Sequence, residues 1–164
     1  MDESGIELKN VWECACGQGH LAEVLKERGL LGKATDLIDR GYGEADTNFY
    51  YSSEIWEGDI LTNPPYGDAL KFCRHALDCV DDGSKVIMLM RIQFLEGKKR
   101  KPFLQATPPK YVYVSSSRLR LAKGGDFEKE AKSNIRHFIK NKEIAWDGDN
   151  DIISLGKRFK IKLL

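Results

Sequence analysis

The sequence predicts an α/β fold, a mostly parallel sheet with helices on both of its faces. Short apolar runs alternate with longer amphipathic segments along the chain, as they do in sheets built from strand-helix-strand units. Residues 85–90 (KVIMLM) are apolar on both faces, like a central parallel strand. A glycine turn, residues 16–19 (CGQG), joins the first apolar run to the first amphipathic segment. Together these observations argue for a covered parallel sheet.

The strands and helices are assigned from hydrophobic periodicity and stop signals. Strands are expected at residues 10–14, 33–38, 48–51, 59–62, 85–90 and 111–114, with a final one within 135–146. Helices are expected at residues 20–28 and 68–80. Their predicted buried faces are Leu21, Val24 and Leu25 in the first, and Leu70, Cys73, Leu77 and Val80 in the second. Gly29 ends the first helix, and Pro64 and Pro65 end the strand at 59–62 because proline cannot join a ladder.

Composition indicates a single globular domain, residues 1–164. The chain is 41% hydrophobic and 31% charged, and 26 Lys and Arg against 25 Asp and Glu leave a formal net charge of +1. Any basic surface is therefore local. No apolar run approaches the roughly 20 residues of a membrane span, and the polar, acidic start does not match a secretory signal. We expect a cytoplasmic protein with no membrane partner.

Four cysteines in a chain of this length predict neither a disulfide scaffold nor a zinc site. The Cys14/Cys16 and Cys73/Cys79 spacings differ from CxxC, and the three histidines share no spacing. We expect reduced thiols, no metal, and no Ser/His/Asp or paired-carboxylate centre.

The glycine turn stands where parallel sheets bind ligands. Between a strand and a helix, backbone amides and the positive helix end converge, and glycine lets a ligand approach closely. The turn lacks the third glycine of the dinucleotide fingerprint and the Lys-Ser/Thr of a phosphate loop, so a plain tight turn is the alternative. Asp36 ends the next strand about 20 residues later, where a carboxylate can bond both hydroxyls of a ribose. Turn and carboxylate together suggest an adenosine-containing ligand.

Residues 63–66 (NPPY) form a stiff segment with unpaired acceptors. Each proline fixes its own φ, and the first pushes Asn63 out of the helical region. The Asn63 amide oxygen and the Pro64 carbonyl can accept both hydrogens of an exocyclic amino group, while Tyr66 offers a flat face for stacking. Two such acceptors localise the nitrogen lone pair and aim it at an electrophilic methyl group. An ordinary N-P-P turn is the alternative interpretation.

Charge is unevenly distributed along the chain. Residues 36–59 hold seven acids and one base, whereas residues 91–123 hold nine bases and one acid. The basic run 98–101 (KKRK) follows the end of the central strand, where we expect it to contact nucleic acid rather than solvent alone. The aromatic residues around it are expected to be buried in the core: Phe94, Phe103, Tyr111 and Tyr113.

The order of these motifs resembles the S-adenosylmethionine-dependent N6-adenine DNA methyltransferases, particularly small phage-type ones. The resemblance rests on E-x-A-C-G-x-G (13–19), A-T-D (34–36), T-N-P-P-Y (62–66), R-x-Q-F-L-E-G-K-K-R (91–100) and P-P-K-Y-V-Y-V-S-S-S-R (108–118). The motif-bearing core is residues 10–120, with no separate target-recognition domain. The resemblance implies a Rossmann-like class I methyltransferase fold, with a mostly parallel seven-stranded sheet and one antiparallel strand near the C-terminus.

Residue by residue, the resemblance implies three sets of site residues. The cofactor-binding set has Glu13, Cys16, Gly17 and Gly19 around the methionine part of S-adenosylmethionine, Asp36 at the ribose and Asp46 at the adenine amino group. It also includes Leu37 and Asn63. Asp59 competes with Asp46 for that role, although it more simply begins the catalytic strand. The catalytic set is Asn63, Pro64, Pro65 and Tyr66. The nucleic-acid-binding set is Lys98, Lys99, Arg100, Lys101 and Arg118.

The implied function is methylation of the N6 amino group of an adenine flipped out of double-stranded DNA. One alternative keeps the chemistry on RNA adenine or protein glutamine, although the E-C-A-C-G turn and the basic stretch argue against glutamine. The other is a shortened, non-catalytic relative that binds nucleic acid or a partner. It is motivated by the short segment before the glycine turn and by residues 134–149 (NIRHFIKNKEIAWDGD), where the family has an aromatic-rich strand. A homodimer or a partner subunit is therefore considered, and sequence specificity is expected to be short or relaxed.

Overall fold

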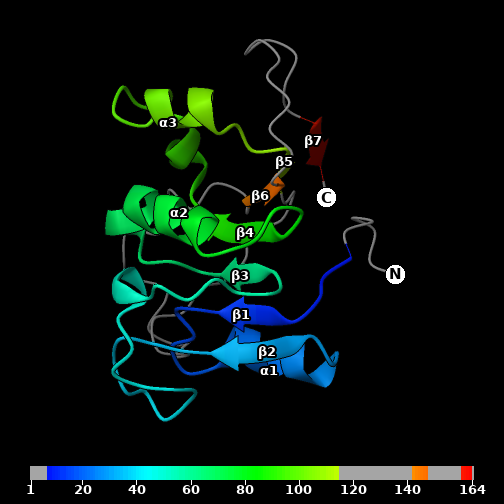
Figure 1. Ribbon diagram of the computed structural model, residues 1–164. Helices are drawn as coiled ribbons and strands as arrows, with labels where there is room; N and C mark the ends of the chain where they lie inside the picture. Colours follow the sequence, from blue (N-terminus) through cyan, green and yellow to red (C-terminus); the bar gives the residue numbers. More distant parts are fainter. Residues whose placement is uncertain (1–6, 115–141, 148–159, 164) are drawn as a thin grey trace, which may run out of the picture.

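The computed structural model describes residues 7–114, 142–147 and 160–163. Its centre is a four-stranded parallel sheet in the order β2-β1-β3-β4. The strands are β1 (Val11–Glu13), β2 (Leu31–Ala34), β3 (Ile60–Thr62) and β4 (Lys85–Met90). The strand order reverses between β1 and β3, so that β2 and β4 lie on opposite sides of this pair (Figure 1). Ligands of open α/β sheets bind beyond the carboxyl ends of the strands at such a reversal.

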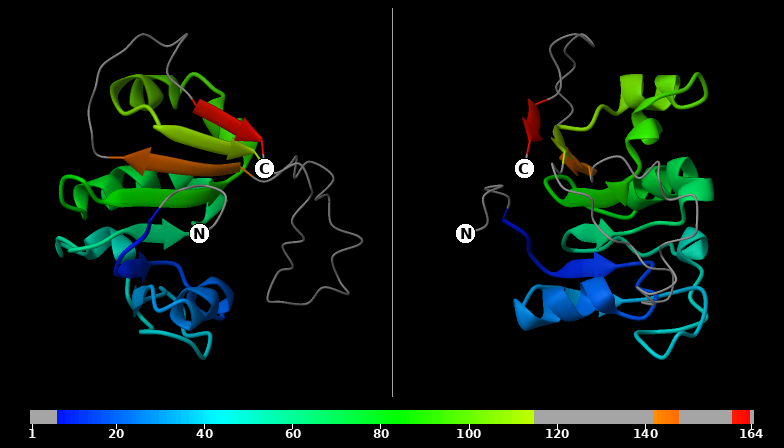
Figure 2. Two further views of the ribbon diagram at one scale, coloured as in Figure 1. Left: turned by 90° about the vertical axis from the view of Figure 1, so that its right-hand side faces the viewer. Right: turned by 180° about the vertical axis from the view of Figure 1, so that it is seen from behind.

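Beyond β4, strand pairing continues through β6 (Lys142–Asp147) and β5 (Tyr111–Val114) to β7 (Lys160–Leu163). β6 pairs antiparallel with both β4 and β5, and β7 pairs parallel with β5 (Figure 2). The antiparallel strand therefore lies inside the sheet rather than at its edge. Of the predicted sheet, the structure shows the α/β layering and a parallel part of four strands, as in the Rossmann-like methyltransferase fold.

Helices α1 (His20–Glu27) and α2 (Ala69–Asp78) lie on opposite faces of the sheet, with α2 in front in Figure 1. Both helices are predicted correctly, and Leu25 and Cys73 of the predicted faces are buried, but the other inward-facing residues differ from those predicted. α1 buries Ala22 and Leu25 and leaves Val24 43% exposed. The buried residues of α2 are Ala69, Phe72, Cys73 and Ala76. Alanine lets a helix axis approach the sheet closely, so the small residues face inward and the larger aliphatic ones pack at the side.

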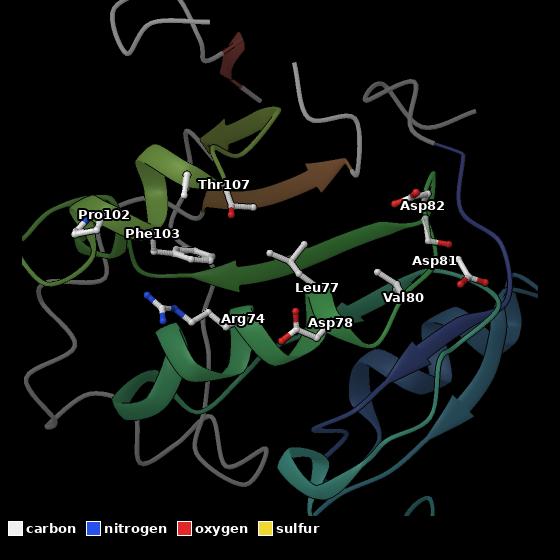
Figure 3. A pocket seen from close by; sticks show the side chains of 11 residues that line it. Arg74, Leu77, Asp78, Val80, Asp81, Asp82, Pro102, Phe103 and Thr107 are labelled. Carbon is white, nitrogen blue, oxygen red and sulfur yellow. The ribbon is translucent and has the colours of Figure 1, made fainter. Parts of the chain in front are cut away.

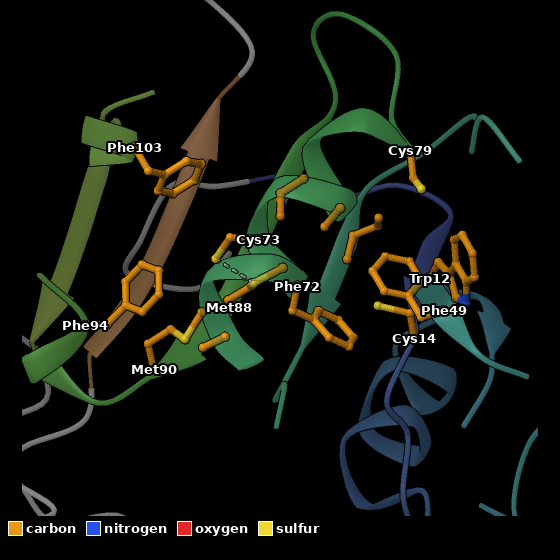
Figure 4. Packing of buried hydrophobic residues seen from close by; sticks show 14 of the residues in the cluster. Trp12, Cys14, Phe49, Phe72, Cys73, Cys79, Met88, Met90, Phe94 and Phe103 are labelled. Carbon is orange, nitrogen blue, oxygen red and sulfur yellow. Dashed lines mark hydrogen bonds between the residues drawn. The ribbon is translucent and has the colours of Figure 1, made fainter. Parts of the chain in front are cut away.

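The main hydrophobic core fills the space between α2 and the sheet (Figure 4). At its centre Phe49 stacks on Phe72 of α2 with ring centroids 4.6 Å apart, and it meets Trp12 of β1 edge-on at 5.3 Å. The Cys73 thiol donates to the Met88 sulfur at 3.3 Å. All four cysteines are free and buried. Three of the aromatic residues of the basic region are buried as predicted, namely Phe94, Phe103 and Tyr113.

Some predicted elements differ in type or extent. Residues 48–51 do not form a strand: Asn48 accepts the Tyr50 N–H at 3.1 Å and starts a 3₁₀ turn, η1 (Phe49–Tyr51), because an Asn side chain favours a turn over a ladder. The strand expected at 33–38 is β2, which ends earlier, at Ala34. The basic run 98–101 leads into a short helix, α3 (Lys101–Ala106), whose first turn accommodates Pro102.

Two further differences concern the C-terminal part of the chain. The strand expected within 135–146 is β6, and residues 115–141 lie outside the described part. β7 is not among the predicted strands. No helix in the described part of the chain has the length and apolar character needed to cross a membrane.

Candidate functional site

A cavity of about 640 Å³ lies at the carboxyl ends of β1, β2 and β3, beside the reversal in strand order. Its size is that of a small-molecule site. Three chain segments line it, namely the glycine turn after β1, the stretch from Asp36 to η1, and the stretch after β3. Predicted site residues among its lining are Gly17, Asp36, Leu37, Asn63, Pro64, Pro65 and Tyr66.

Asp36 joins the glycine turn to the end of β2. Its Oδ2 accepts the Gly17 N–H at 2.7 Å, its Oδ1 accepts the Ile38 N–H at 2.9 Å, and the Arg40 Nε lies 3.9 Å from Oδ1. The side chain is largely buried and borders the cavity. Each carboxylate oxygen keeps a further lone pair, so a fixed carboxylate can still accept hydrogen bonds from two neighbouring hydroxyls.

The two glycines of the turn have different surroundings. A Cβ on Gly17 would meet only the Arg40 Cδ, at 4.0 Å, so space is open beside it, and Gly17 lines the cavity. A Cβ on Gly19 would lie 2.3 Å from the Tyr42 ring, and Gly19 is absent from the lining. Cys16 is also absent from the lining; its buried thiol points to the Tyr42 carbonyl at 3.6 Å, and burial raises its pKa to about 11.

Glu13 ends β1 beneath the cavity, in a fully buried position outside the lining. Burial raises the pKa of its carboxyl to about 8, and the negative charge of Asp36 adds to this. The Ala15 N–H, which donates to Oε1 at 3.2 Å, and the neighbouring Thr62 hydroxyl partly offset that rise. Glu13 is therefore mainly protonated at neutral pH in this structure.

The stretch after β3 presents unpaired acceptors to the cavity. Pro65 has extended backbone angles, and Asn63 is exposed while Pro64 is buried. Within the described part of the chain, neither the Asn63 amide nor the Pro64 carbonyl takes part in a hydrogen bond. The Tyr66 ring follows, with the Arg91 guanidinium 4.9 Å from its centroid. Burial raises the pKa of the Tyr66 phenol, and the Arg91 charge opposes this rise.

The two acids considered for the adenine position lie elsewhere. Asp46 is exposed, has φ +54°, and is not part of the lining; Thr47 and Asn48 border the cavity instead. Asp59 lies at the amino end of β3, on the opposite edge of the sheet, where it accepts the Lys9 N–H at 2.8 Å and the Lys85 N–H at 2.7 Å. Asp59 therefore lies directly before β3 (Ile60–Thr62), at the edge of the sheet away from the cavity.

Several lining residues are not identified by the sequence reasoning: Arg40, Thr47, Asn48, Phe49, Tyr50 and Phe72. Tyr50 has a buried hydroxyl with no partner in the described part of the chain. The turn-forming Asn48 before an aromatic pair is the one local signal that marks this region, and it does not show that the pair reaches the cavity.

The basic run separates into two kinds of residue. Lys98, Lys99 and Lys101 are exposed beyond the end of β4. Arg100 instead donates to the Glu96 carbonyl at 2.8 Å and the Gln93 carbonyl at 2.7 Å, so it holds the turn before α3. Arg118 lies outside the described residues.

A second cavity, of about 530 Å³, lies between α2 and α3 (Figure 3). Arg74, Leu77 and Phe103 contribute to its walls, and Arg74 lies over the Phe103 ring at 5.5 Å. No predicted site residue lines this cavity. The cavity at the strand reversal is therefore the candidate site.

No protein-family model and no curated protein matches this sequence. Among solved structures, a Listeria monocytogenes protein described as a class I S-adenosylmethionine-dependent methyltransferase superposes with a TM-score of 0.59 at 10% identity, over 94% of this chain and 58% of that one. A Streptococcus thermophilus protein described as a hemolysin superposes with a TM-score of 0.60 at 12% identity, over 90% of this chain and 62% of that one. An Agrobacterium tumefaciens protein described as an O-methyltransferase superposes with a TM-score of 0.54 at 12% identity, over 93% of this chain and 76% of that one.

These similarities establish a shared fold alone. This chain has the α/β architecture of class I methyltransferases, and two of the three neighbours are described as methyltransferases. It spans about three fifths of the length of the first two neighbours. The cavity at the strand reversal therefore lies where this fold binds ligands.

Proposed function

We propose that this chain is an S-adenosylmethionine-dependent methyltransferase that acts on an exocyclic amino nitrogen, the N6 of adenine in DNA. One observation carries the proposal: the unpaired Asn63 and Pro64 acceptors border the same cavity as Gly17 and Asp36. An adenosine-bearing methyl donor needs a carboxylate for its ribose, and an amine acceptor needs two oxygens. This cavity offers both.

The residues of the cavity fit S-adenosylmethionine. Asp36 presents a carboxylate held by two N–H donors, and open space lies beside Gly17. Leu37 and Ile38 are 57% and 51% exposed at the cavity, an apolar surface suited to an adenine ring. When bound, the cofactor supplies an electrophilic methyl carbon on a sulfonium sulfur.

Asn63, Pro64 and Tyr66 would act on the target base. The Asn63 amide oxygen and the Pro64 carbonyl accept the two amino hydrogens, which keeps the nitrogen lone pair out of the ring system and directs it into the cavity. The Arg91 guanidinium covers one face of the Tyr66 ring. The base therefore stacks on the other face. The nitrogen becomes acidic as it gains the methyl carbon, so its proton leaves to water without a general base.

The charge around the site supports a nucleic acid rather than a glutamine side chain. Arg91 lies directly after β4, and Lys98, Lys99 and Lys101 are exposed on the segment that continues from it. Arg91 lies over the flat Tyr66 ring, and with the exposed lysines of the same segment it suits a phosphate backbone and a base, whereas a neutral amide needs no such charge. A double-stranded target would present its adenine by base flipping.

The proposal is tested by methyl transfer from tritiated S-adenosylmethionine to duplex DNA, RNA and a glutamine peptide. DNA is expected to be the best acceptor. Asn63→Ala should lower kcat by about 10²–10³-fold, because one acceptor for the developing charge is lost. Its melting temperature should stay within about 2 °C of wild type, because Asn63 is exposed, and this separates a catalytic defect from a folding defect.

Other outcomes would redirect the proposal. A wild-type rate in Asn63→Ala would overturn the mechanism, and transfer to RNA or peptide alone would change the substrate. Binding of S-adenosylhomocysteine without transfer to any acceptor would favour the non-catalytic relative.

A further inference from the structure

The segment after Asp36 turns back over the end of β2. The Glu44 N–H donates to the Ala34 carbonyl at 2.9 Å, and the Asp36 N–H donates to the Glu44 carbonyl at 3.0 Å. Gly43 passes so close to β2 that a Cβ there would lie 2.7 Å from the Ala34 carbonyl oxygen. These contacts fix the backbone on both sides of Gly43 and leave Tyr42 next to the glycine turn.

Tyr42 packs directly on that turn. A Cβ on Gly19 would lie 2.3, 2.4 and 2.7 Å from three carbons of the Tyr42 ring, so the ring rests on the Gly19 backbone. Glu23, in the first turn of α1, raises the pKa of the Tyr42 phenol to about 12, and Tyr42 in turn lowers the pKa of Glu23, so the two side chains interact. The Cys16 thiol meets the Tyr42 carbonyl at 3.6 Å. One residue thus contacts the turn at both of its ends and the helix that follows it.

Gly17, two residues before Gly19, has the opposite environment. Its N–H donates to Asp36 at 2.7 Å, and the space beside it belongs to the cavity. Both glycines have a positive φ, +56° at Gly17 and +84° at Gly19, which favours glycine at each position. Their surroundings differ: a side chain at Gly17 would border the cavity, whereas one at Gly19 would collide with Tyr42.

We propose that Tyr42 is a positioning residue of the cofactor site, which clamps the glycine turn at Gly19 and so holds the Gly17 N–H on Asp36. The inference rests on the proposed function in one respect, that this cavity binds S-adenosylmethionine. It predicts that Tyr42 controls cofactor affinity without lining the cavity, and that Gly19 is needed because of Tyr42 rather than because of the ligand.

The test is a mutant cycle with two readouts, the melting temperature and the affinity for S-adenosylhomocysteine by calorimetry at 20 °C. The variants are Gly19→Ala, Tyr42→Ala, the double variant, Tyr42→Phe and Gly17→Ala. Gly29→Ala is the matched control, because Gly29 has φ +69° and a Cβ added there would meet nothing within 4 Å, so it reports backbone strain alone.

Gly29→Ala should lower the melting temperature by about 2–4 °C and leave affinity unchanged. Gly19→Ala should have a lower melting temperature than Gly29→Ala, or should fail to fold. The Gly19→Ala/Tyr42→Ala double variant should be more stable and bind more tightly than Gly19→Ala. Tyr42→Ala should weaken affinity roughly tenfold, while Tyr42→Phe, which keeps the ring, should lose much less. Gly17→Ala should lose affinity with a melting change like that of Gly29→Ala, and adding Tyr42→Ala should not restore it.

The outcomes separate the inference from the proposed function. A double variant as impaired as Gly19→Ala in both readouts would overturn the clamp, because the left-handed backbone at Gly19 (φ +84°) would then account for the loss without Tyr42. Wild-type affinity in Tyr42→Ala would also overturn it, with the proposed function intact. No binding to the wild-type protein would overturn the proposed function and, with it, the cofactor role of Tyr42, whereas recovery of melting in the double variant would still establish the Tyr42–Gly19 contact.

Discussion

The polar groups at the two ends of β3 differ in their hydrogen bonding. At the amino end, Asp59 is fully buried and both of its oxygens accept backbone N–H groups, from Lys9 and Lys85. At the carboxyl end, four residues later, the Asn63 amide and the Pro64 carbonyl have no partner within the described residues. The buried, fully satisfied carboxylate stabilises the fold. The acceptors at the other end of β3 remain available to the ligand that we propose.

The largest expected effect on stability is at the amino end of β3. Asp59→Ala should lower the free energy of unfolding by about 4 kcal/mol, because two backbone N–H groups and the nearby Lys85 ammonium lose their acceptor. Asn63→Ala should change it by less than about 0.5 kcal/mol. Urea unfolding of both variants tests the contrast, and equal losses would break it.

At the carboxyl end of β1, Glu13 is a buried carboxyl with no cation beside it among the described residues. Its folded-state pKa of about 8 exceeds the ordinary value of 4.5, so the folded protein holds this proton more tightly than the unfolded chain does. The stability due to that proton is fully present below pH 4.5 and is lost as pH rises to about 8. Wild type should lose on the order of 3 kcal/mol more than Glu13→Gln across this window, measured by urea unfolding at about pH 5 and about pH 8.5. Parallel profiles for the two proteins would contradict the prediction.

Arg91 and Arg74 form a matched pair of cation–π contacts in different places. Arg91 lies over Tyr66 at the carboxyl end, and Arg74 lies over Phe103 between α2 and α3. Arg91→Ala should raise the KM for DNA about tenfold, and Arg91→Lys should recover part of this loss. Arg74→Ala should leave steady-state methylation unchanged. Similar KM values for DNA in Arg91→Ala and Arg74→Ala would show that Arg91 does not contribute to DNA binding.

The smallest expected effects are in the basic run. Lys98→Ala or Lys101→Ala should weaken DNA binding a few-fold and reduce the slope of log affinity against log salt by about 1, because each lysine is exposed. Arg100→Ala should instead cost about 1 kcal/mol of stability, since Arg100 holds two backbone carbonyls. Fluorescence anisotropy across a salt series measures the first effect and thermal melting the second. An unchanged salt slope in both lysine variants would exclude the run from the interface.

Local backbone constraints explain which parts of the site are predictable. Gly17, Asp36 and the NPPY segment are recognisable from local chemistry alone. Glycine adopts backbone conformations that other residues avoid, two consecutive prolines fix φ, and Asp36 supplies a carboxylate at a strand end. All three border the same cavity. The orientation of helices is less predictable, as the inward-facing alanines of α1 and α2 show, because it depends on how closely each helix approaches the sheet.

Residues from distant segments could not be placed in the site from the sequence. Phe72 reaches the cavity from α2, and Tyr50 reaches it from a turn that the sequence suggests as a strand. Arg100 looks like its lysine neighbours but bonds to the backbone. These roles depend on contacts between segments far apart in the chain, which residue order does not reveal.

The sequence by itself determined the alternation of strands and helices, the glycine turn after β1 and the stiff acceptor segment after β3, because each follows from short-range steric and hydrogen-bonding preferences. The tertiary structure alone decided that Gly17 faces the cavity while Gly19 supports Tyr42, and that Asp59 stabilises one end of the strand whose other end carries Asn63. Two residues of the same type, or two polar residues on one strand, acquire different roles only when packing assigns them different neighbours.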